Sequence, residues 1–255
     1  MKRLSLLVPL FMIMSACTGQ TDDPNRVIEC LPDAIGTSRQ ITLDGSVATM
    51  DLLRDHEVVL TYDDGPHVHE TQRVLDELSR QCVKATFFLR GDNASRNRSL
   101  VRLIRQRGHA LGGHSWSHPD LIRLSPSEAR DQILRGNQAI ENAVHTIPGD
   151  EDFTIRLFRF PFLHINDDLD QQMSQLGLIP VWVQADGADW SGIPAEEIVE
   201  RIFINLERAG GKGVILLHPP TGTAEDSTRM LIRQLKSEGY SIVAINPPEP
   251  PAYTH

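Results

Sequence analysis

From residue 57 onward the chain alternates short apolar runs with amphipathic segments, and this alternation limits the possible folds more than any other feature. Seven runs rich in β-branched, aromatic and aliphatic residues have the length of strands. They cover residues 57–62, 85–90, 109–114, 157–162, 179–186, 213–218 and 241–245. Strands interleaved with helices predict an α/β fold with a parallel sheet, which is either rolled into a barrel or open and doubly wound.

The segments between these runs carry helix signals. Ser125 can cap a helix that has Pro126 at its first position and Glu128 reaching back to the cap, so we expect the longest helix to run from there to about His145. Other helix candidates cover residues 70–81, 99–108, 170–177, 196–210 and 227–239, and several end in glycine, the usual residue just past a helix.

The N-terminal residues read as a targeting signal. In residues 1–16, Lys2 and Arg3 are followed by an apolar run and then by small residues, which is the pattern of a secretory signal peptide. The small residues run into Cys17, which resembles the lipobox of bacterial lipoproteins, where that cysteine becomes the lipidated N-terminus. An ordinary signal peptide with an incidental cysteine is the alternative. The resemblance predicts an exported protein that is lipid-anchored in the bacterial cell envelope, at the outer membrane or in the periplasm.

The rest of the chain divides by composition. We expect a polar tether at residues 17–27, an N-terminal extension at 28–56, a main domain at 57–246 and a Pro-rich tail at 247–255. In the extension, two runs flank Asp44-Gly45 and predict a β-hairpin. Cys30 and Cys82 either form a disulfide or remain two unpaired thiols.

The net charge of -9 argues against nucleic acid as a partner, because the chain has no excess of lysine and arginine to neutralise phosphates. We expect a monomer that has no nucleic-acid ligand.

Polar side chains follow the predicted strands at the point where each strand ends. Asp63, His114, Arg159, Asp189 and His218 all lie at or just past such an end. In parallel α/β folds that edge of the sheet is where ligands bind and chemistry occurs. The sequence therefore predicts a functional site there.

His114 and His118 have a spacing that can direct two imidazoles at one ion, from a helical turn or from a loop of similar pitch. Ordinary surface or core histidines are the alternative. A carboxylate from another strand end would complete three ligands with an open position, which is the arrangement of a catalytic zinc. Of the adjacent Asp63 and Asp64, one can be this ligand and the other the general base.

With these residues in view, the chain resembles the polysaccharide deacetylases of carbohydrate esterase family 4, the NodB homology group. The resemblance runs from about residue 57 to 245 and matches five motifs in order, which here read TYDDGP (61–66), HSWSH (114–118), RFPF (159–162), DGADW (186–190) and LLH (216–218). It implies a distorted (β/α)7 barrel with a small N-terminal β-containing extension.

The implied activity is removal of N-acetyl groups from glycans that contain N-acetylglucosamine, such as chitin oligomers, peptidoglycan or exopolysaccharide. Zn²⁺ is the implied cofactor, with Co²⁺ as another option. In this reading the metal ligands are Asp64, His114 and His118, and the catalytic residues are Asp63 as base, Arg159 holding that base, His218 as general acid and Asp189 orienting it.

The resemblance also implies substrate contacts. The backbone N–H of Phe162 would bind the oxyanion, Trp190 would form a wall of the groove, and Leu216 would line the pocket for the acetyl methyl. We also expect Asp186 and Trp116 to contact substrate. Trp182, inside a predicted strand, is interpreted as core, and His164 as surface or packing.

Two departures from the family pattern bear on the substrate. Leu163 stands where the family commonly has glycine, and Pro219 follows His218 where aspartate is common. Two alternatives remain open: an acetylxylan esterase that uses the same site on an ester, and a non-catalytic lipid-anchored protein that binds glycans.

Overall fold

Strand β2 (Glu57–Asp63) lies at the centre of the fold, and every one of its residues is buried. The computed structural model describes residues 36–45 and 48–246. On one side β2 pairs along most of its length with β8 (Gly213–Leu217), and on the other its C-terminal half pairs with β3 (Thr86–Leu89). From β3 the sheet continues to β4 (Ala110–Gly113), β5 (Leu157–Phe158) and β6 (Ile179–Pro180). All of these pairs are parallel, as the sequence predicts.

The segment 179–186 joins the two ends of this sheet. Where the sequence predicts one strand, the structure has two short ones, β6 and β7 (Ala185–Asp186). Next to β6, the Val181 N–H donates to the Phe158 carbonyl at 2.9 Å, and next to β7 the Gln184 N–H donates to the Val214 carbonyl at 3.0 Å. The segment therefore connects β5 to β8 and completes a distorted barrel, which confirms the expected fold class.

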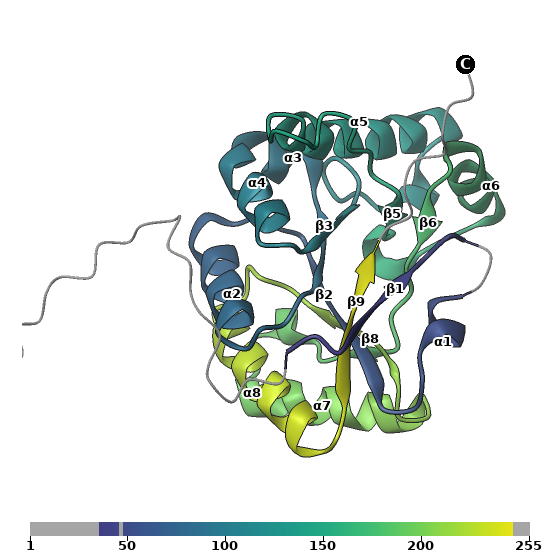
Figure 1. Cartoon of the computed structure of the whole chain (residues 1–255). Helices are drawn as coiled ribbons and strands as arrows, with labels where there is room; N and C mark the ends of the chain where they lie inside the picture. The colour runs from purple at the N-terminus through teal and green to yellow at the C-terminus, as the bar shows by residue number, and fades with distance from the viewer. Residues whose placement is uncertain (1–35, 46–47, 247–255) are drawn as a thin grey trace, which may run out of the picture.

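Helices cover the outside of the barrel (Figure 1). They are α2 (Val68–Arg80), α3 (Gly91–Arg96), α4 (Arg98–Gln106), α5 (Pro126–Val144), α6 (Asp167–Leu176), α7 (Ala195–Arg208) and α8 (Ala224–Ser237). Short 3-10 turns lie at Leu121–Arg123, Pro161–Leu163 and Asp189–Ser191. The expected capping box at the start of α5 is present, because Ser125 and Glu128 each bond the other's backbone N–H. Of the helices, α3 has no counterpart in the sequence prediction.

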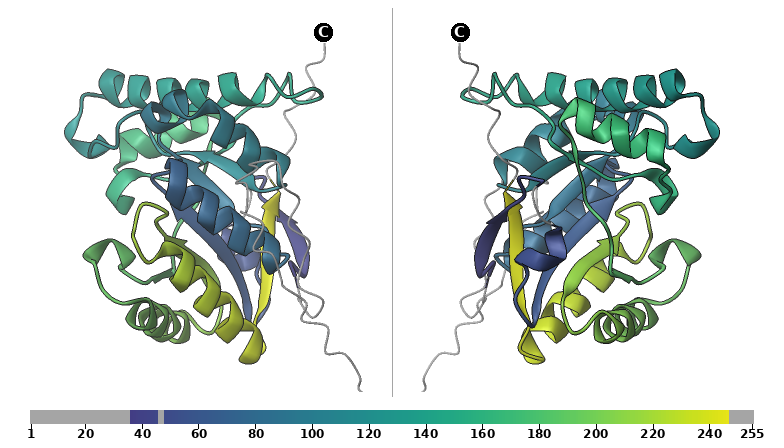
Figure 2. Two further views of the ribbon diagram at one scale, coloured as in Figure 1. Left: turned by 90° about the vertical axis from the view of Figure 1, so that its left-hand side faces the viewer. Right: turned by 90° about the vertical axis from the view of Figure 1, so that its right-hand side faces the viewer.

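The expected hairpin around Asp44-Gly45 is wrong. β1 (Arg39–Thr42) pairs in parallel with the distant β9 (Ser241–Asn246), and the second predicted run, at 46–50, ends in the first residues of the short helix α1 (Thr49–Leu52). Figure 2 shows β1 and β9 side by side along one flank of the molecule. Ile41 and Leu43 are buried in the same apolar cluster as the inward-facing barrel residues, so burial against the barrel decides the pairing of this strand.

Two apolar clusters make up the core. The smaller one fills the barrel and includes Val59, Phe88 and Val214, while the larger one lies between the strands and the surrounding helices. Among the described helices, none has the length and hydropathy of a membrane span.

Several predictions for the two ends of the chain fall on residues outside the described ranges. They concern the signal peptide, the anchor at Cys17, the tether and the tail. Cys82, two residues after α2, is disulfide-bonded. Its expected partner Cys30 lies outside the described residues, so the Cys30–Cys82 pairing stays a prediction.

Candidate active site

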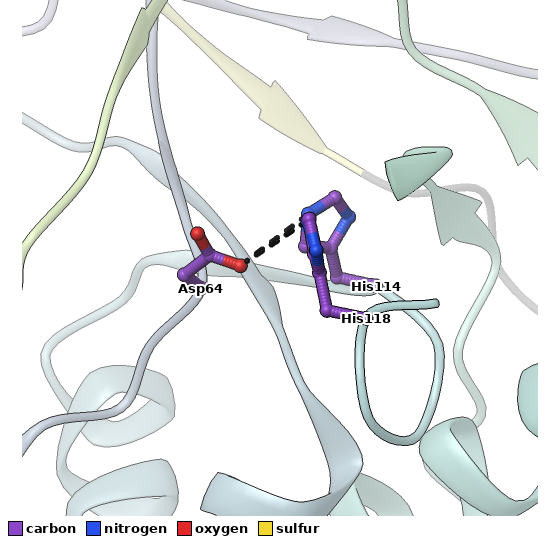
Figure 3. A group of neighbouring side chains, drawn as sticks. All are labelled: Asp64, His114 and His118. Carbon is purple, nitrogen blue, oxygen red and sulfur yellow. Dashed lines mark ion pairs between the residues drawn. The ribbon is translucent and has the colours of Figure 1, made fainter. Parts of the chain in front are cut away.

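Three side chains from two strand ends converge on one point. Asp64 follows β2, and His114 and His118 follow β4. Asp64 Oδ1 lies 3.7 Å from His114 Nε2 and 3.5 Å from His118 Nε2. Figure 3 shows the carboxylate facing the two imidazole rings. All three donor atoms lie within 4.8 Å of one another, which is close enough for one ion to contact each of them.

The state of these donors suits a divalent cation. His114 Nδ1 lies 2.7 Å from the Arg159 carbonyl oxygen, and because a carbonyl only accepts, Nδ1 carries the proton and Nε2 presents a lone pair. Burial lowers the pKa of His114 to about 3, so the ring is neutral. Asp64 Oδ1 is buried and has no hydrogen-bond partner in the described chain. Two imidazole nitrogens and an unpaired carboxylate oxygen form a donor set that fits zinc.

The backbone around these ligands is held in an unfavourable conformation. Asp64, Ser115 and His118 all have positive φ, at 69°, 62° and 61°. This region costs an L-residue about 1–2 kcal/mol, so surrounding contacts must maintain it. One such contact is the Ser115 Oγ atom, which accepts the His118 N–H at 3.0 Å. His114 and His118 therefore lie on a loop and not on a helical turn.

Helix α5 packs tightly against this histidine loop. Gly136 leaves so little space that a Cβ atom there would lie 2.5 Å from the Ser115 carbonyl oxygen. The Gln132 Oε1 atom accepts the Ser117 N–H at 3.0 Å. The Arg135 guanidinium lies 4.5 Å from the centre of the Trp116 ring. This packing holds Trp116 against α5, and Trp116 is not among the residues that line the cavity beside the three donors, so its expected substrate contact stays a prediction.

Asp63 faces the same cavity but is held differently from Asp64. Its Oδ1 accepts a hydrogen bond of 2.8 Å from Arg159, whose side chain is fully buried. Arg159 also donates to the Thr61 hydroxyl at 2.7 Å, and its guanidinium lies 4.2 Å from the Phe88 ring centre. Burial raises the pKa of Asp63, and the Arg159 charge opposes that rise. The second oxygen, Oδ2, lies 3.9 Å from His114 Nε2.

His218, at the end of β8, is bound twice to Asp189. Its Nδ1 lies 2.7 Å from Asp189 Oδ1, and its backbone N–H donates to Asp189 Oδ2 at 2.7 Å. Burial alone would lower the pKa of His218, but the hydrogen bond and charge of Asp189, together with the Asp63 and Asp64 charges, raise it to about 9. The ring is therefore protonated near neutral pH, with its Nε2–H free of the Asp189 contact.

One cavity of about 990 Å³ is lined by Asp63, Asp64, His114, His118, Asp189 and His218. Of the residues expected to contact substrate, four line it: Phe162, Trp190, Leu216 and Asp186. Phe162 has φ 58°, and among the described residues its backbone N–H has no hydrogen-bond partner. The structure thus brings together every predicted catalytic and metal residue, and the role of each stays a prediction.

The structure adds lining residues that carry no role in the sequence prediction. These are Phe160, His164, Gly192, Pro220, Thr221, Gly222 and Thr223, and Leu163, which the sequence singles out as a departure that bears on the substrate, also lines the cavity. Most of them adjoin a predicted motif, and this proximity in the sequence is the signal that could have found them. The interpretation of Trp182 as core is wrong. It lies between β6 and β7 with 37% of its surface exposed, and its ring stacks on Phe160.

Comparison with known proteins agrees with this geometry. Residues 53–181 match the family described as polysaccharide deacetylase. A peptidoglycan-N-acetylglucosamine deacetylase of Bacillus cereus is 31% identical over 74% of this chain and 66% of its own length. A chitooligosaccharide deacetylase of a Bradyrhizobium species is 31% identical over 75% of this chain and 90% of its own length.

A solved structure shows the same fold over most of the chain. The peptidoglycan deacetylase structure from Bdellovibrio bacteriovorus has a TM-score of 0.73 and 26% sequence identity, and covers 92% of this chain and 63% of that one. The chain spans about two thirds or less of the length of both peptidoglycan deacetylases. The matched family segment contains the three predicted metal ligands and also the predicted catalytic residues Asp63 and Arg159. The chain belongs to the polysaccharide deacetylase family.

Proposed function

We propose that the chain is a metal-dependent N-deacetylase that removes acetyl groups from glycans containing N-acetylglucosamine and releases acetate. One observation carries this proposal: a single cavity presents the three metal donors, the Asp63 carboxylate that the buried Arg159 holds, and the His218–Asp189 pair. Together these groups can accept one proton, donate another and hold an ion between them, as amide hydrolysis requires.

Zn²⁺ is the ion we propose for Asp64, His114 and His118, with Co²⁺ as another option, because both accept nitrogen and oxygen donors. When bound there, the ion would polarise the acetamide carbonyl and make an adjacent water more acidic. The buried Asp64 Oδ1, which has no hydrogen-bond partner within the described chain, supports this assignment, because a buried carboxylate oxygen without a hydrogen bond is costly unless a cation binds it.

Asp63 is suited to take a proton from the attacking water. Arg159 fixes Oδ1, so Oδ2 remains as the acceptor, and the carboxylate cannot rotate away from the donor cluster. Burial raises the pKa of Asp63 towards neutral pH, and a general base is most effective when its pKa lies near the working pH. The water oxygen then joins the acyl carbon of the acetamide.

His218 is suited to protonate the leaving nitrogen. Asp189 holds Nδ1, so the protonated ring can give its Nε2 proton to the amine while the C–N bond breaks. The free Phe162 N–H can donate to the carbonyl oxygen as charge develops there, a contribution of about 3 kcal/mol for one such donor. Acetate and a free amino sugar are the products.

The test is acetate release from chitin oligomers, peptidoglycan fragments and acetylated xylan, with protein that is zinc-loaded or chelated and with Asp63→Asn as the control. We expect chelator-sensitive release from an N-acetylated glycan and almost none from the control. Release from xylan alone would identify an esterase. A glycan that binds the zinc-loaded protein without acetate release would favour the binding-protein alternative.

We also propose that the chain is exported and lipid-anchored through Cys17, on the evidence of residues 1–17 alone. Labelled fatty acid should be incorporated by the unaltered chain and not by Cys17→Ser in a bacterial host. Equal labelling of both would overturn the anchor without affecting the proposed hydrolysis.

A further inference from the structure

A row of three rings leads from the metal donors along one wall of the cavity. The Phe162 ring meets the His118 ring edge-on, with 4.7 Å between centroids, and the His164 ring lies 6.0 Å from the Phe162 ring. All three side chains line the cavity. His164 therefore lies one ring further than Phe162 from the proposed reaction centre, on the same wall.

His164 is oriented by a fixed partner. Its Nδ1 lies 3.2 Å from Asp120 Oδ1, and Arg123 Nε lies 3.2 Å from the other Asp120 oxygen. The Asp120 side chain is 17% exposed, whereas that of His164 is 52% exposed. Because the carboxylate can only accept, Nδ1 of His164 carries the proton, and Nε2 takes no part in this contact. A half-exposed ring is thus held with one nitrogen left for a ligand.

The cavity has room for more than the sugar that reacts. Its volume of about 990 Å³ is at the upper end of the range of about 300–1,000 Å³ for pockets that take drug-sized ligands, and one acetamido sugar is smaller than such a ligand. A glycan whose acetamide reaches Asp63 and His218 must therefore place its neighbouring sugar along a wall. The wall that carries His164 offers an oriented polar group to that sugar.

We propose that His164, oriented by Asp120, forms a hydrogen bond through Nε2 with a hydroxyl group of the sugar adjacent to the one that loses its acetyl group. The site thereby selects glycan chains over single sugars. This inference rests on the proposed function for the class of ligand, and it adds a substrate-binding residue to the wall that His118 and Phe162 begin. Asp120 is a positioning residue, because it acts through His164.

The test compares His164→Ala and Asp120→Asn with the unaltered protein on N-acetylglucosamine oligomers from the monomer to the hexamer. Loss of one hydrogen bond should lower kcat/KM on the long oligomers about tenfold in His164→Ala, through KM and not kcat. The same variant should change the rate on the shortest substrate by less than about twofold. Asp120→Asn should show the same pattern with a smaller effect.

His69→Ala is the matched control, because His69 is exposed on α2 and does not line the cavity. It should leave all rates unchanged. An equal loss on every oligomer length in His164→Ala, or a loss in kcat alone, would overturn the proposal in favour of a structural role. Unchanged constants in His164→Ala on every length would also overturn it.

A binding measurement separates this inference from the proposed function. In Asp63→Asn, which should bind glycan without hydrolysing it, calorimetry should show the hexamer bound about tenfold more weakly when His164→Ala is added. That result would support the contact even if the unaltered protein released no acetate. Equal hexamer affinity with and without His164 would reject it, whatever the catalytic result.

Discussion

At the scale of single residues, the contacts of the two adjacent aspartates distinguish the proposed base from the proposed metal ligand. Asp63 is held by the buried Arg159, whereas Asp64 has a buried oxygen with no hydrogen-bond partner among the described residues. The sequence predicts that one is a ligand and the other a base, and the family resemblance assigns each role. The packing of Arg159 inside the barrel, over Phe88, is set by distant strands and so could not be derived from local sequence.

We expect the two aspartates to separate metal binding from hydrolysis. Asp63→Asn should keep its zinc and lose about 10²–10⁴-fold in kcat, because an amide cannot take the water's proton. Asp64→Asn should instead lose zinc along with activity. Zinc content by atomic absorption and acetate release measure both effects. Zinc loss in Asp63→Asn with retention in Asp64→Asn would reverse the assignment.

A second residue-scale prediction concerns the pH dependence of kcat. His218 has a pKa raised to about 9, so its acid form is present below that pH and is lost as the pH rises through it. Asp189→Asn removes the main stabiliser of the charged ring, so the alkaline limb of the profile should move down by about one unit or more. An unmoved limb would show that another group sets it. A cation bound to Asp64 would offset the rise that the Asp64 charge causes in the pKa of His218. The alkaline limb of the unaltered protein should therefore lie at or below about pH 9.

At the scale of elements, helix α5 supports the loop that carries two of the three ligands. The sequence predicts the helix and its cap, because both signals are local. It does not predict the close approach of Gly136 to Ser115 or the Gln132 contact with Ser117, because these join segments that are separate in the chain. The packing of Arg135 on Trp116 could not be predicted for the same reason.

This packing predicts an effect of α5 on metal affinity. Gln132→Ala removes an acceptor for the loop backbone and should weaken zinc binding about tenfold, as loss of outer partners commonly does. Gln138→Ala, on the same helix and bonded only to the exposed Asn142 side chain, is the matched control and should leave affinity unchanged. Competition with a chromogenic chelator gives both constants. Similar affinities for the two variants would show that the loop holds its shape without α5.

At the scale of the whole molecule, the barrel follows from the alternation of strands and helices, but its closure does not. Segment 179–186 pairs with β5 at one end and β8 at the other, so it forms two strands from one apolar run. β1 pairs with β9 near the C-terminal end of the described chain, and Ser38 donates to Ile242 across 204 residues. No local turn signal indicates such a partner, which is why Asp44-Gly45 suggested a hairpin.

The buried His109 should make the stability of the whole fold depend on pH. Burial, helped by Lys84 and Arg107, lowers its pKa from 6.5 to about 3. Below pH 6.5 the unfolded chain takes up a proton that the folded chain does not, so stability falls as the pH drops towards 3. His109→Asn should reduce the loss of unfolding free energy between pH 7 and pH 5 by about 2 kcal/mol. Urea unfolding at both values measures this, and His69→Asn should leave the pH dependence unchanged.

The central claim is that one metal-dependent site hydrolyses the amide of an acetylated amino sugar. Its most direct test counts acetate and new free amine from a soluble N-acetylglucosamine oligomer before chelation, after chelation and after zinc is returned. The account predicts one amine for each acetate, loss of both on chelation and recovery of both with zinc. Equal release in the presence of chelator, or acetate without amine, would contradict it.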